Sequence, residues 1–143
     1  MRKAKILGGL SAFLLLLLLG AGIVDPTLLA LGGDGPRVIQ ITADRDNRFK
    51  VPGQKQPIIT VKAGEVIKLR ITAHKGTEWD KDGAIHSFTV TALKDRGWDI
   101  RLKEGTKDYT LVAPDEPGEY AIECLVKCGN GHDDMKMKLV VTK

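Results

Sequence analysis

Four potential soft metal ligands lie within twelve residues near the C-terminal end of the sequence. They are two thiols, an imidazole and a thioether, carried by Cys124, Cys128, His132 and Met135. Sulfur and imidazole ligands favour copper, zinc or iron–sulfur clusters over magnesium or calcium. Two glycines between the second cysteine and the histidine allow the loop to curl until these side chains point at one spot. The segment therefore predicts a metal-binding loop.

The elements that must position these ligands are predicted to be β-strands. Apolar and polar residues alternate in short segments separated by turn residues, and no helical period is apparent. The expected strands are Val38–Ala43, Ile58–Val61, Val66–Ala73, Ala84–Leu93, Trp98–Lys103, Tyr109–Ala113, Glu119–Cys124 and Lys136–Thr142. Roughly six to eight short strands at this spacing predict an all-β sandwich.

Strand alternation brings further candidates to the site. His86 shares a strand face with Phe88, Cys124 shares one with Ile122, and Met135 lies on the apolar face of the last strand. If the apolar faces line the core, these three candidates point inward at strand ends. We therefore expect a site at one end of the sandwich, partly shielded from water.

Other residues that are able to bind metal or carry electrons are expected to play structural roles. His74 is predicted to be a solvated loop residue, and Met137 to belong to the core of the last strand. Trp79 and Trp98 are predicted to be packing residues. An alternative for Trp79, in the loop before His86, is a place near the metal where electrons enter.

The whole pattern resembles a known copper domain. It combines Cys-x3-Cys-x3-His-x2-Met with an upstream Ile-His-Ser-Phe strand and a Pro-Gly-Glu-Tyr turn before the first cysteine. This combination resembles the binuclear copper (Cu-A) domain of cytochrome c oxidase subunit II, and nitrous oxide reductase carries a similar domain. The resemblance runs from about residue 38 to the end and is strong from Glu65 onward. It implies a cupredoxin-like Greek-key β-sandwich.

The resemblance also implies a ligand set for two copper ions. Both cysteines would bridge the ions as thiolates, and each ion would receive one histidine and one weaker ligand. The implied ligands are His86 and Met135 for one copper, His132 and the backbone carbonyl of Val126 for the other, with Cys124 and Cys128 shared. Bridging thiolates let one electron spread over both metals, so little geometry changes on electron transfer.

The implied role is one-electron transfer in a haem–copper terminal oxidase, as a subunit II-like component. A c-type cytochrome or a small copper protein would donate the electron, and a membrane oxidase subunit would accept it, with any catalysis on that partner. Two features depart from the family. Lys127 places a positive charge beside the site, and the aromatic cluster that subunit II commonly uses to receive electrons is not evident.

The N-terminal segment predicts export. Arg2, Lys3 and Lys5 precede an almost unbroken apolar run, Ile6–Val24. Positive charge before an apolar run is typical of exported chains. The run has about 19 residues, longer than the roughly 7–15 of a signal peptide core and nearly long enough to cross the hydrocarbon layer as a helix.

We expect a retained single-pass anchor in the cell membrane, with the copper domain on the outer, extracytoplasmic side. Alternatively, Gly20 and Gly22 suit a cleavage site, which would make the protein secreted or periplasmic. The predicted division is residues 1–35 as anchor or signal peptide plus tether, and 36–143 as the cupredoxin-like copper-binding domain.

The charge of the chain argues against nucleic acid as a partner. The formal net charge is +4, but three of the 22 basic residues belong to the N-terminal segment. The remaining 19 basic residues face 18 acidic ones, a net charge of +1. Because basic and acidic residues are nearly equal in number, the chain shows no basic excess that would attract a phosphate backbone.

Three alternatives remain open from the residues alone. The ligands Cys128, His132, Met135 and His86 suffice for a mononuclear blue-copper carrier, with Cys124 as a spectator. A copper-trafficking protein would hold the metal for insertion into an oxidase. In an exported protein, two cysteines also suit a disulfide that closes a metal-free β-sandwich.

Overall fold

The computed structural model describes residues 35–143, which form two β-sheets. The predicted anchor or signal segment lies outside the described residues, apart from Gly35. No helix in the described part is long and apolar enough to span a membrane. The elements are β1 (Arg37–Ala43), β2 (Phe49–Lys50), β3 (Ile58–Lys62), β4 (Val66–Ala73), β5 (His86–Thr89), η2 (Thr91–Arg96), β6 (Asp99–Leu102), β7 (Gly105–Val112), β8 (Gly118–Glu123), η3 (His132–Asp134) and β9 (Lys136–Thr142).

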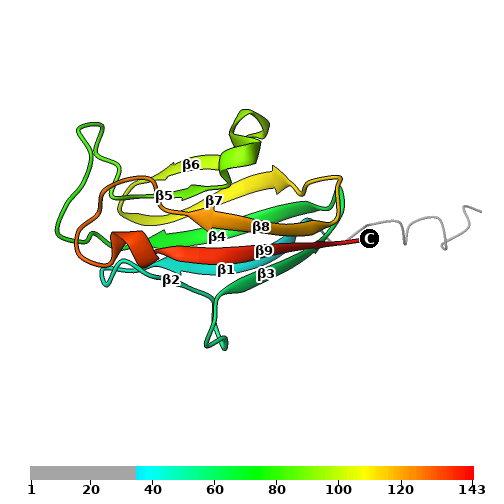
Figure 1. The fold of residues 1–143 in the computed structure, drawn as a ribbon, viewed down its shortest axis with the longest axis horizontal. Helices are drawn as coiled ribbons and strands as arrows, with labels where there is room; N and C mark the ends of the chain where they lie inside the picture. The colour runs from blue at the N-terminus through cyan, green and yellow to red at the C-terminus, as the bar shows by residue number, and fades with distance from the viewer. Residues whose placement is uncertain (1–34) are drawn as a thin grey trace, which may run out of the picture. The chain divides into compact units, whose positions relative to one another are not determined.

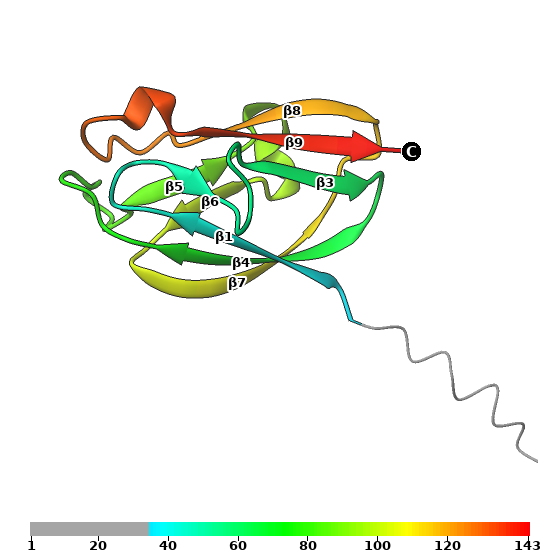
Figure 2. The ribbon, with the colours of Figure 1, turned by 90° about the horizontal axis from the view of Figure 1, so that it is seen from below.

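The sheets stack face to face as a sandwich (Figures 1 and 2). One sheet has the order β2-β1-β4-β7 and the other the order β3-β9-β8-β5-β6. The pairs β1–β4 and β3–β9 are parallel, and the other pairs are antiparallel. The chain changes sheet between β2 and β3 and again before β4. The predicted all-β sandwich is therefore confirmed.

Alternation along the strands builds the core. In β4, Ile67, Leu69 and Ile71 are buried between the sheets, while Arg70 on the opposite face is exposed. A strand with this period of two presents one apolar face to the partner sheet and one polar face to water. Trp98 is buried as predicted, and its indole N–H donates to the backbone carbonyl of Val112 at 3.0 Å.

Two strands differ from their predicted bounds by more than one residue at an end. The expected strand Ala84–Leu93 is only His86–Thr89, because the chain turns into η2 after Val90, whose N–H donates to the carbonyl of Trp98 at 2.8 Å. That turn keeps β6 beside β5. The expected strand Tyr109–Ala113 begins earlier, at Gly105, because β7 pairs with β4 along its full length.

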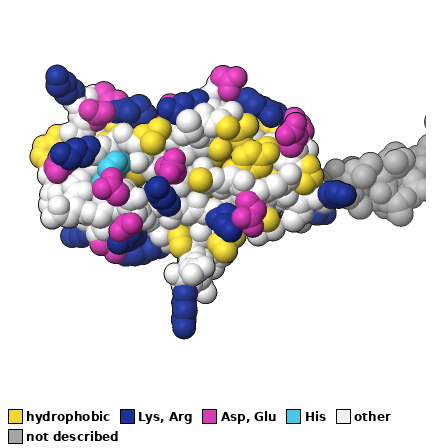
Figure 3. All heavy atoms as spheres, viewed as in Figure 1, with side chains coloured by type: hydrophobic (Ala, Val, Ile, Leu, Met, Phe, Trp, Pro, Cys, Tyr) yellow, Lys and Arg dark blue, Asp and Glu magenta, His cyan; other side chains and the backbone are white. Residues whose placement is uncertain are grey.

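The outer surface carries interspersed charges. Basic and acidic side chains alternate over the face drawn in Figure 3. Several form ion pairs between neighbouring strands, such as Lys138 with Glu119 at 2.8 Å and Arg70 with Asp108 at 2.8 Å. Exposed pairs of this kind contribute little to stability, about 0–1 kcal/mol each. The apolar core between the sheets therefore carries most of the stability of the fold.

Replacing Phe88 by Ala is expected to lower the free energy of unfolding by about 3–5 kcal/mol, because the substitution leaves a cavity in the core. Phe88 is fully buried in β5, and its ring lies edge-on to that of Phe49 across the sandwich, with centroids 5.6 Å apart. Denaturant unfolding of the metal-free protein measures the loss. The matched control is Val38→Ala on the exposed face of β1, where we expect a change within about 0.5 kcal/mol. Equal losses in both variants would contradict this assignment of the core.

Candidate metal centre

The candidate ligands lie at the end of the sandwich opposite the C-terminus. Three loops meet there: 44–48 after β1, 74–85 between β4 and β5, and 124–135 between β8 and β9 (Figures 1 and 2). Strand β5 begins at His86, and the neighbouring strand β8 ends one residue before Cys124. These two candidates therefore stand at the ends of adjacent strands, as strand alternation predicted.

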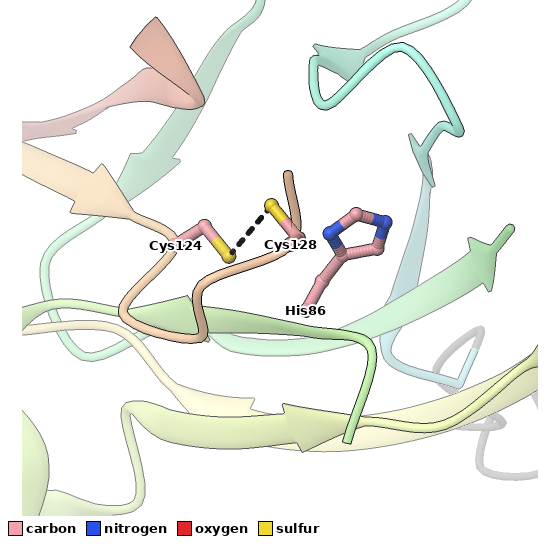
Figure 4. Close-up of side chains that lie close together, drawn as sticks. All are labelled: His86, Cys124 and Cys128. Atoms are coloured by element: carbon pink, nitrogen blue, oxygen red, sulfur yellow. Dashed lines mark hydrogen bonds between the residues drawn. The ribbon is translucent and has the colours of Figure 1, made fainter. Parts of the chain in front are cut away.

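The side chains of His86, Cys124 and Cys128 converge inside the protein. Their ligand atoms all lie within 4.8 Å of one another, and all three residues are buried. Figure 4 shows one nitrogen of the imidazole ring facing the sulfur of Cys128. The two sulfur atoms are 3.9 Å apart and both cysteines are free thiols. This separation is about twice the length of a disulfide bond, roughly 2.05 Å.

The remaining candidate ligands gather around the same two sulfur atoms. The sulfur of Cys128 lies 3.7 Å from Nδ1 of His132 and 3.8 Å from Sδ of Met135. The backbone carbonyl oxygen of Val126 lies 3.2 Å from the sulfur of Cys124. The structure thus brings together all six residues to which the sequence resemblance gives a ligand role. Coordination of a metal by them stays a prediction.

The curl of the loop depends on two glycines. Gly129 and Gly131 have φ angles of 119° and 90°, in a region that favours glycine. A side chain on Gly129 would overlap Oγ1 of Thr77. Between them the loop closes through the N–H of His132, which donates to the carbonyl of Gly129 at 3.1 Å. This closure returns the imidazole of His132 towards Cys128.

His86 presents a ring nitrogen that suits metal binding. Its Nε2 lies 2.9 Å from the backbone carbonyl of His74 and must donate to it, because a carbonyl only accepts. The other nitrogen, Nδ1, is buried and has no hydrogen-bond partner within residues 35–143. An unpaired buried polar atom costs about 1–3 kcal/mol. A soft cation beside the two thiols would offset that cost, so the residues fit the copper that the resemblance implies.

The two thiols perturb each other's pKa values in opposite directions. The contact with the Cys128 thiol lowers the pKa of Cys124 to about 4, although burial opposes the shift. The backbone N–H of Ser87 acts in the same direction as Cys128. The contact with Cys124, together with burial, raises the pKa of Cys128. The pair therefore loses its first proton readily and retains its second.

Strand β5 also holds Cys124 in place through hydrogen bonds of Ser87. The N–H of Ser87 donates to the Cys124 sulfur at 3.3 Å, and the Ser87 hydroxyl accepts from the N–H of Leu125 at 2.7 Å. Oγ1 of Thr89, which is also buried, lies 3.0 Å from the Ser87 hydroxyl oxygen. The contacts of Ser87 cannot be predicted from the sequence pattern. Strand alternation predicts which face a residue occupies, but it does not identify the partner that the residue meets there.

The centre opens to the surface beside His132. A cavity of about 210 Å³ lies there, lined by Glu123, Cys124, Leu125, His132, Asp133 and Lys136. His132 is half-buried, whereas His86, Cys128 and Met135 are fully buried. An incoming metal ion or partner would therefore meet the imidazole of His132 first among the candidate ligands of the described chain.

Two predictions about loop 74–85 need correction. Trp79 was expected to be a packing residue, and this was wrong, because its side chain is 53% exposed. The loop stands outside both sheets, and the indole packs under the ammonium group of Lys75, 3.3 Å from the ring centroid. His74 was expected to be solvated, but it is half-buried at the point where its carbonyl accepts from His86.

No family model matches the sequence, and no curated protein matches it. Solved structures match by shape. A chain of a heme-copper terminal oxidase dimer matches with a TM-score of 0.53 at 17% identity, over 76% of this chain and 66% of that chain. The multicopper oxidase Fet3p, which functions in iron import, matches with a TM-score of 0.50 at 17% identity, over 76% of this chain and 23% of that chain.

The chain has the cupredoxin fold. This confirms the cupredoxin-like sandwich that the resemblance implied. The periplasmic domain of subunit II of cytochrome oxidase from Bradyrhizobium japonicum also matches, with a TM-score of 0.49 at 15% identity, over 75% of this chain and 84% of that chain. The cupredoxin domain described here spans just under two thirds of the terminal-oxidase chain.

The reduced, metal-free cupredoxin domain is expected to carry one thiolate per chain at neutral pH, because the pKa of Cys124 is lowered to about 4 and that of Cys128 is raised. Ultraviolet thiolate absorbance as a function of pH measures this. The folded-state pKa of Cys124 lies below the ordinary thiol value of about 8.5. Its ionisation therefore stabilises the metal-free fold, and that stabilisation is lost as the pH falls through the folded-state pKa.

Cys128→Ala is the informative variant for this titration. It removes the thiol that contacts Cys124, so the pKa of Cys124 should move up towards its ordinary value. A Cys124 titration that is the same in Cys128→Ala and in the parent protein would show that the thiol pair does not set this pKa.

Proposed function

We propose that this chain is an exported copper protein whose binuclear centre carries single electrons, as a subunit II-like component of a haem–copper terminal oxidase. The observation that carries the proposal is the pair of buried free thiols, 3.9 Å apart, with further copper-type ligands around both sulfur atoms. The similarity in fold to a chain of a heme-copper terminal oxidase supports it.

The chain's own residues suit a centre of this kind. Cys124 and Cys128 project from one loop towards the same point, which allows each sulfur to serve two ions. His86 offers its Nδ1 from β5, while Nε2 is held by the carbonyl of His74. Two copper ions bridged by thiolates would share one electron. Because the surrounding side chains are buried at the end of a rigid β-sandwich, they would move little when the charge changes.

We propose His86 and Met135 as ligands of one copper, and His132 and the Val126 carbonyl as ligands of the other. Both cysteines would be shared. In the structure without metal, the Met135 sulfur and the His132 nitrogen both lie against Cys128, at 3.8 and 3.7 Å. The Val126 carbonyl lies against Cys124 instead. Proposed metal ligands therefore lie beside each of the two sulfur atoms.

The proposed setting is the outer side of the cell membrane. Residues 1–35 would anchor the chain as a single span, or leave it periplasmic after cleavage, and residues 36–143 would carry the copper. A c-type cytochrome or a small copper protein is the proposed donor, and a membrane oxidase subunit the proposed acceptor. The cavity beside His132 is lined by two of the proposed ligand side chains, Cys124 and His132.

One observation favours a second candidate, a mononuclear blue-copper carrier. The sulfur of Cys128 alone contacts both His132 and Met135. With His86 this makes a set of one thiolate, two imidazoles and a thioether, which suits a single copper. Cys124 would then remain outside the coordination sphere.

Copper content and electron paramagnetic resonance of the loaded protein separate these candidates. The proposal expects two copper ions per chain and one unpaired electron shared over both nuclei, because both thiolates bridge. One copper ion per chain with the intense colour of a blue site would contradict it.

Two cysteine variants give an independent check on this assignment. In a binuclear centre, Cys124→Ser and Cys128→Ser both abolish the shared-electron spectrum, because each removes a bridge. In a mononuclear centre, Cys124→Ser keeps the copper spectrum and only Cys128→Ser loses it. Met137→Leu serves as the control, since Met137 is buried in β9 among core residues and should leave the spectrum unchanged.

A further inference from the structure

A turn far from the ligands in sequence lies against the ligand loop. Asn47, in the turn between β1 and β2, is only 2% exposed although its side chain is polar. Its backbone has a φ of 55°, and within residues 35–143 it is the one residue other than glycine with a positive φ. Asparagine tolerates this conformation better than most residues. The turn itself closes through the N–H of Asn47, which donates to the carbonyl of Asp44 at 2.9 Å.

Asn47 and its neighbour contact the ligand loop on both sides of His132. Nδ2 of Asn47 donates to the backbone carbonyl of Asn130 at 2.6 Å. The guanidinium group of Arg48 donates to the backbone carbonyl of Asp134 at 3.0 Å and lies 3.3 Å from its carboxylate. The two contacts fall two residues before and two residues after His132, so the turn spans the ligand.

Two glycines, Gly76 and Gly129, pack closely against the Asn47 side chain. A Cβ built on Gly76 would lie 2.6 Å from Oδ1 of Asn47, and one built on Gly129 would lie 3.3 Å from its Nδ2. Gly76 belongs to loop 74–85, whose Glu78 N–H donates to the carbonyl of Cys128 at 3.2 Å. The Asn47 side chain therefore lies between two loops at the metal end, and one of these, loop 124–135, carries five of the six candidate ligands.

The orientation of the Asn47 amide is fixed by these contacts. Its Oδ1 is buried without a hydrogen-bond partner among the residues that the structure describes. Exchanging the oxygen and nitrogen would bring two oxygen atoms together at Asn130, so the present orientation is the favourable one. Turn formation alone does not require this burial, because a glycine would adopt the same backbone conformation without the side chain.

We propose that Asn47 is a positioning residue that holds the loop from Gly129 to Asp134 closed around the centre and fixes the imidazole of His132 in place. The inference deepens the proposed function, since it concerns the ligand that borders the surface opening. A loop held at one backbone carbonyl before His132 and another after it allows that imidazole little freedom to leave the metal.

Asn47→Gly tests the proposal, because it removes the side chain and keeps a backbone that accepts a φ of 55°. Asn130→Ala is the matched control. Asn130 offers only its backbone carbonyl to Asn47, and its own side chain is exposed. Amide hydrogen exchange of the metal-free protein reports the closure of the loop, and the rate of Cu(I) transfer from loaded protein to an excess of chelator reports the hold on the metal.

In Asn47→Gly, the amides of residues 129–134 should exchange about tenfold faster, as expected for the loss of one buried hydrogen bond, while the amides of β4 keep their rates. Cu(I) transfer should accelerate by a similar factor, and Asn130→Ala should match the parent protein in both measurements. Unchanged exchange at residues 129–134 would overturn the proposal, and so would equal acceleration in β4, which would indicate a general loss of stability.

The two measurements separate this proposal from the proposed function. If the protein binds no copper but the loop amides of Asn47→Gly exchange faster, the positioning role stands and the copper function fails. If copper binds and leaves the variant at the parent rate with unchanged loop exchange, the copper function stands and the positioning role fails.

Discussion

The contact on which the site depends is the close approach of two buried thiols at the end of a β-sandwich. Their sulfur atoms are 3.9 Å apart in surroundings that exclude most water. Two negative charges are costly in such a place unless a cation or hydrogen-bond donors compensate them. The N–H of Ser87, which donates to the Cys124 sulfur, supplies part of that compensation. Metal binding would supply the rest.

The fold meets this constraint by combining segments that are distant in sequence. Strand β5 supplies His86, the loop from Cys124 to Met135 supplies the sulfur ligands, and the turn after β1 encloses that loop from outside. The strands hold the ends of these segments through continuous ladders of hydrogen bonds. If the centre holds copper as proposed, this scaffold would keep its geometry nearly unchanged when the centre gains or loses an electron.

A cavity at the surface borders the candidate centre. The cavity beside His132 reaches the surface between the two halves of the ligand loop, and Lys136 and Glu123 form an ion pair at its edge, 3.2 Å apart. The exposed Trp79 and Leu125 also belong to loops at this end of the molecule. Burial of the other candidate ligands would limit the reorganisation of solvent around the proposed copper centre, and the half-buried His132 would offer a path for electrons or metal.

The sequence by itself determined the sandwich, most strand positions and the candidate ligands. Strand alternation and metal-ligand spacing are local patterns that can be recognised in the sequence. Strands β4 and β9 have the bounds that alternation predicted. The tertiary structure alone decided the early end of β5, the exposure of Trp79 and the contacts of Ser87 and Asn47. Asn47 reaches a carbonyl 83 residues away, and Ser87 reaches a sulfur 37 residues away. Such contacts depend on how the sheets and loops pack together. Alternation along one strand does not indicate which residues of other segments will lie next to it.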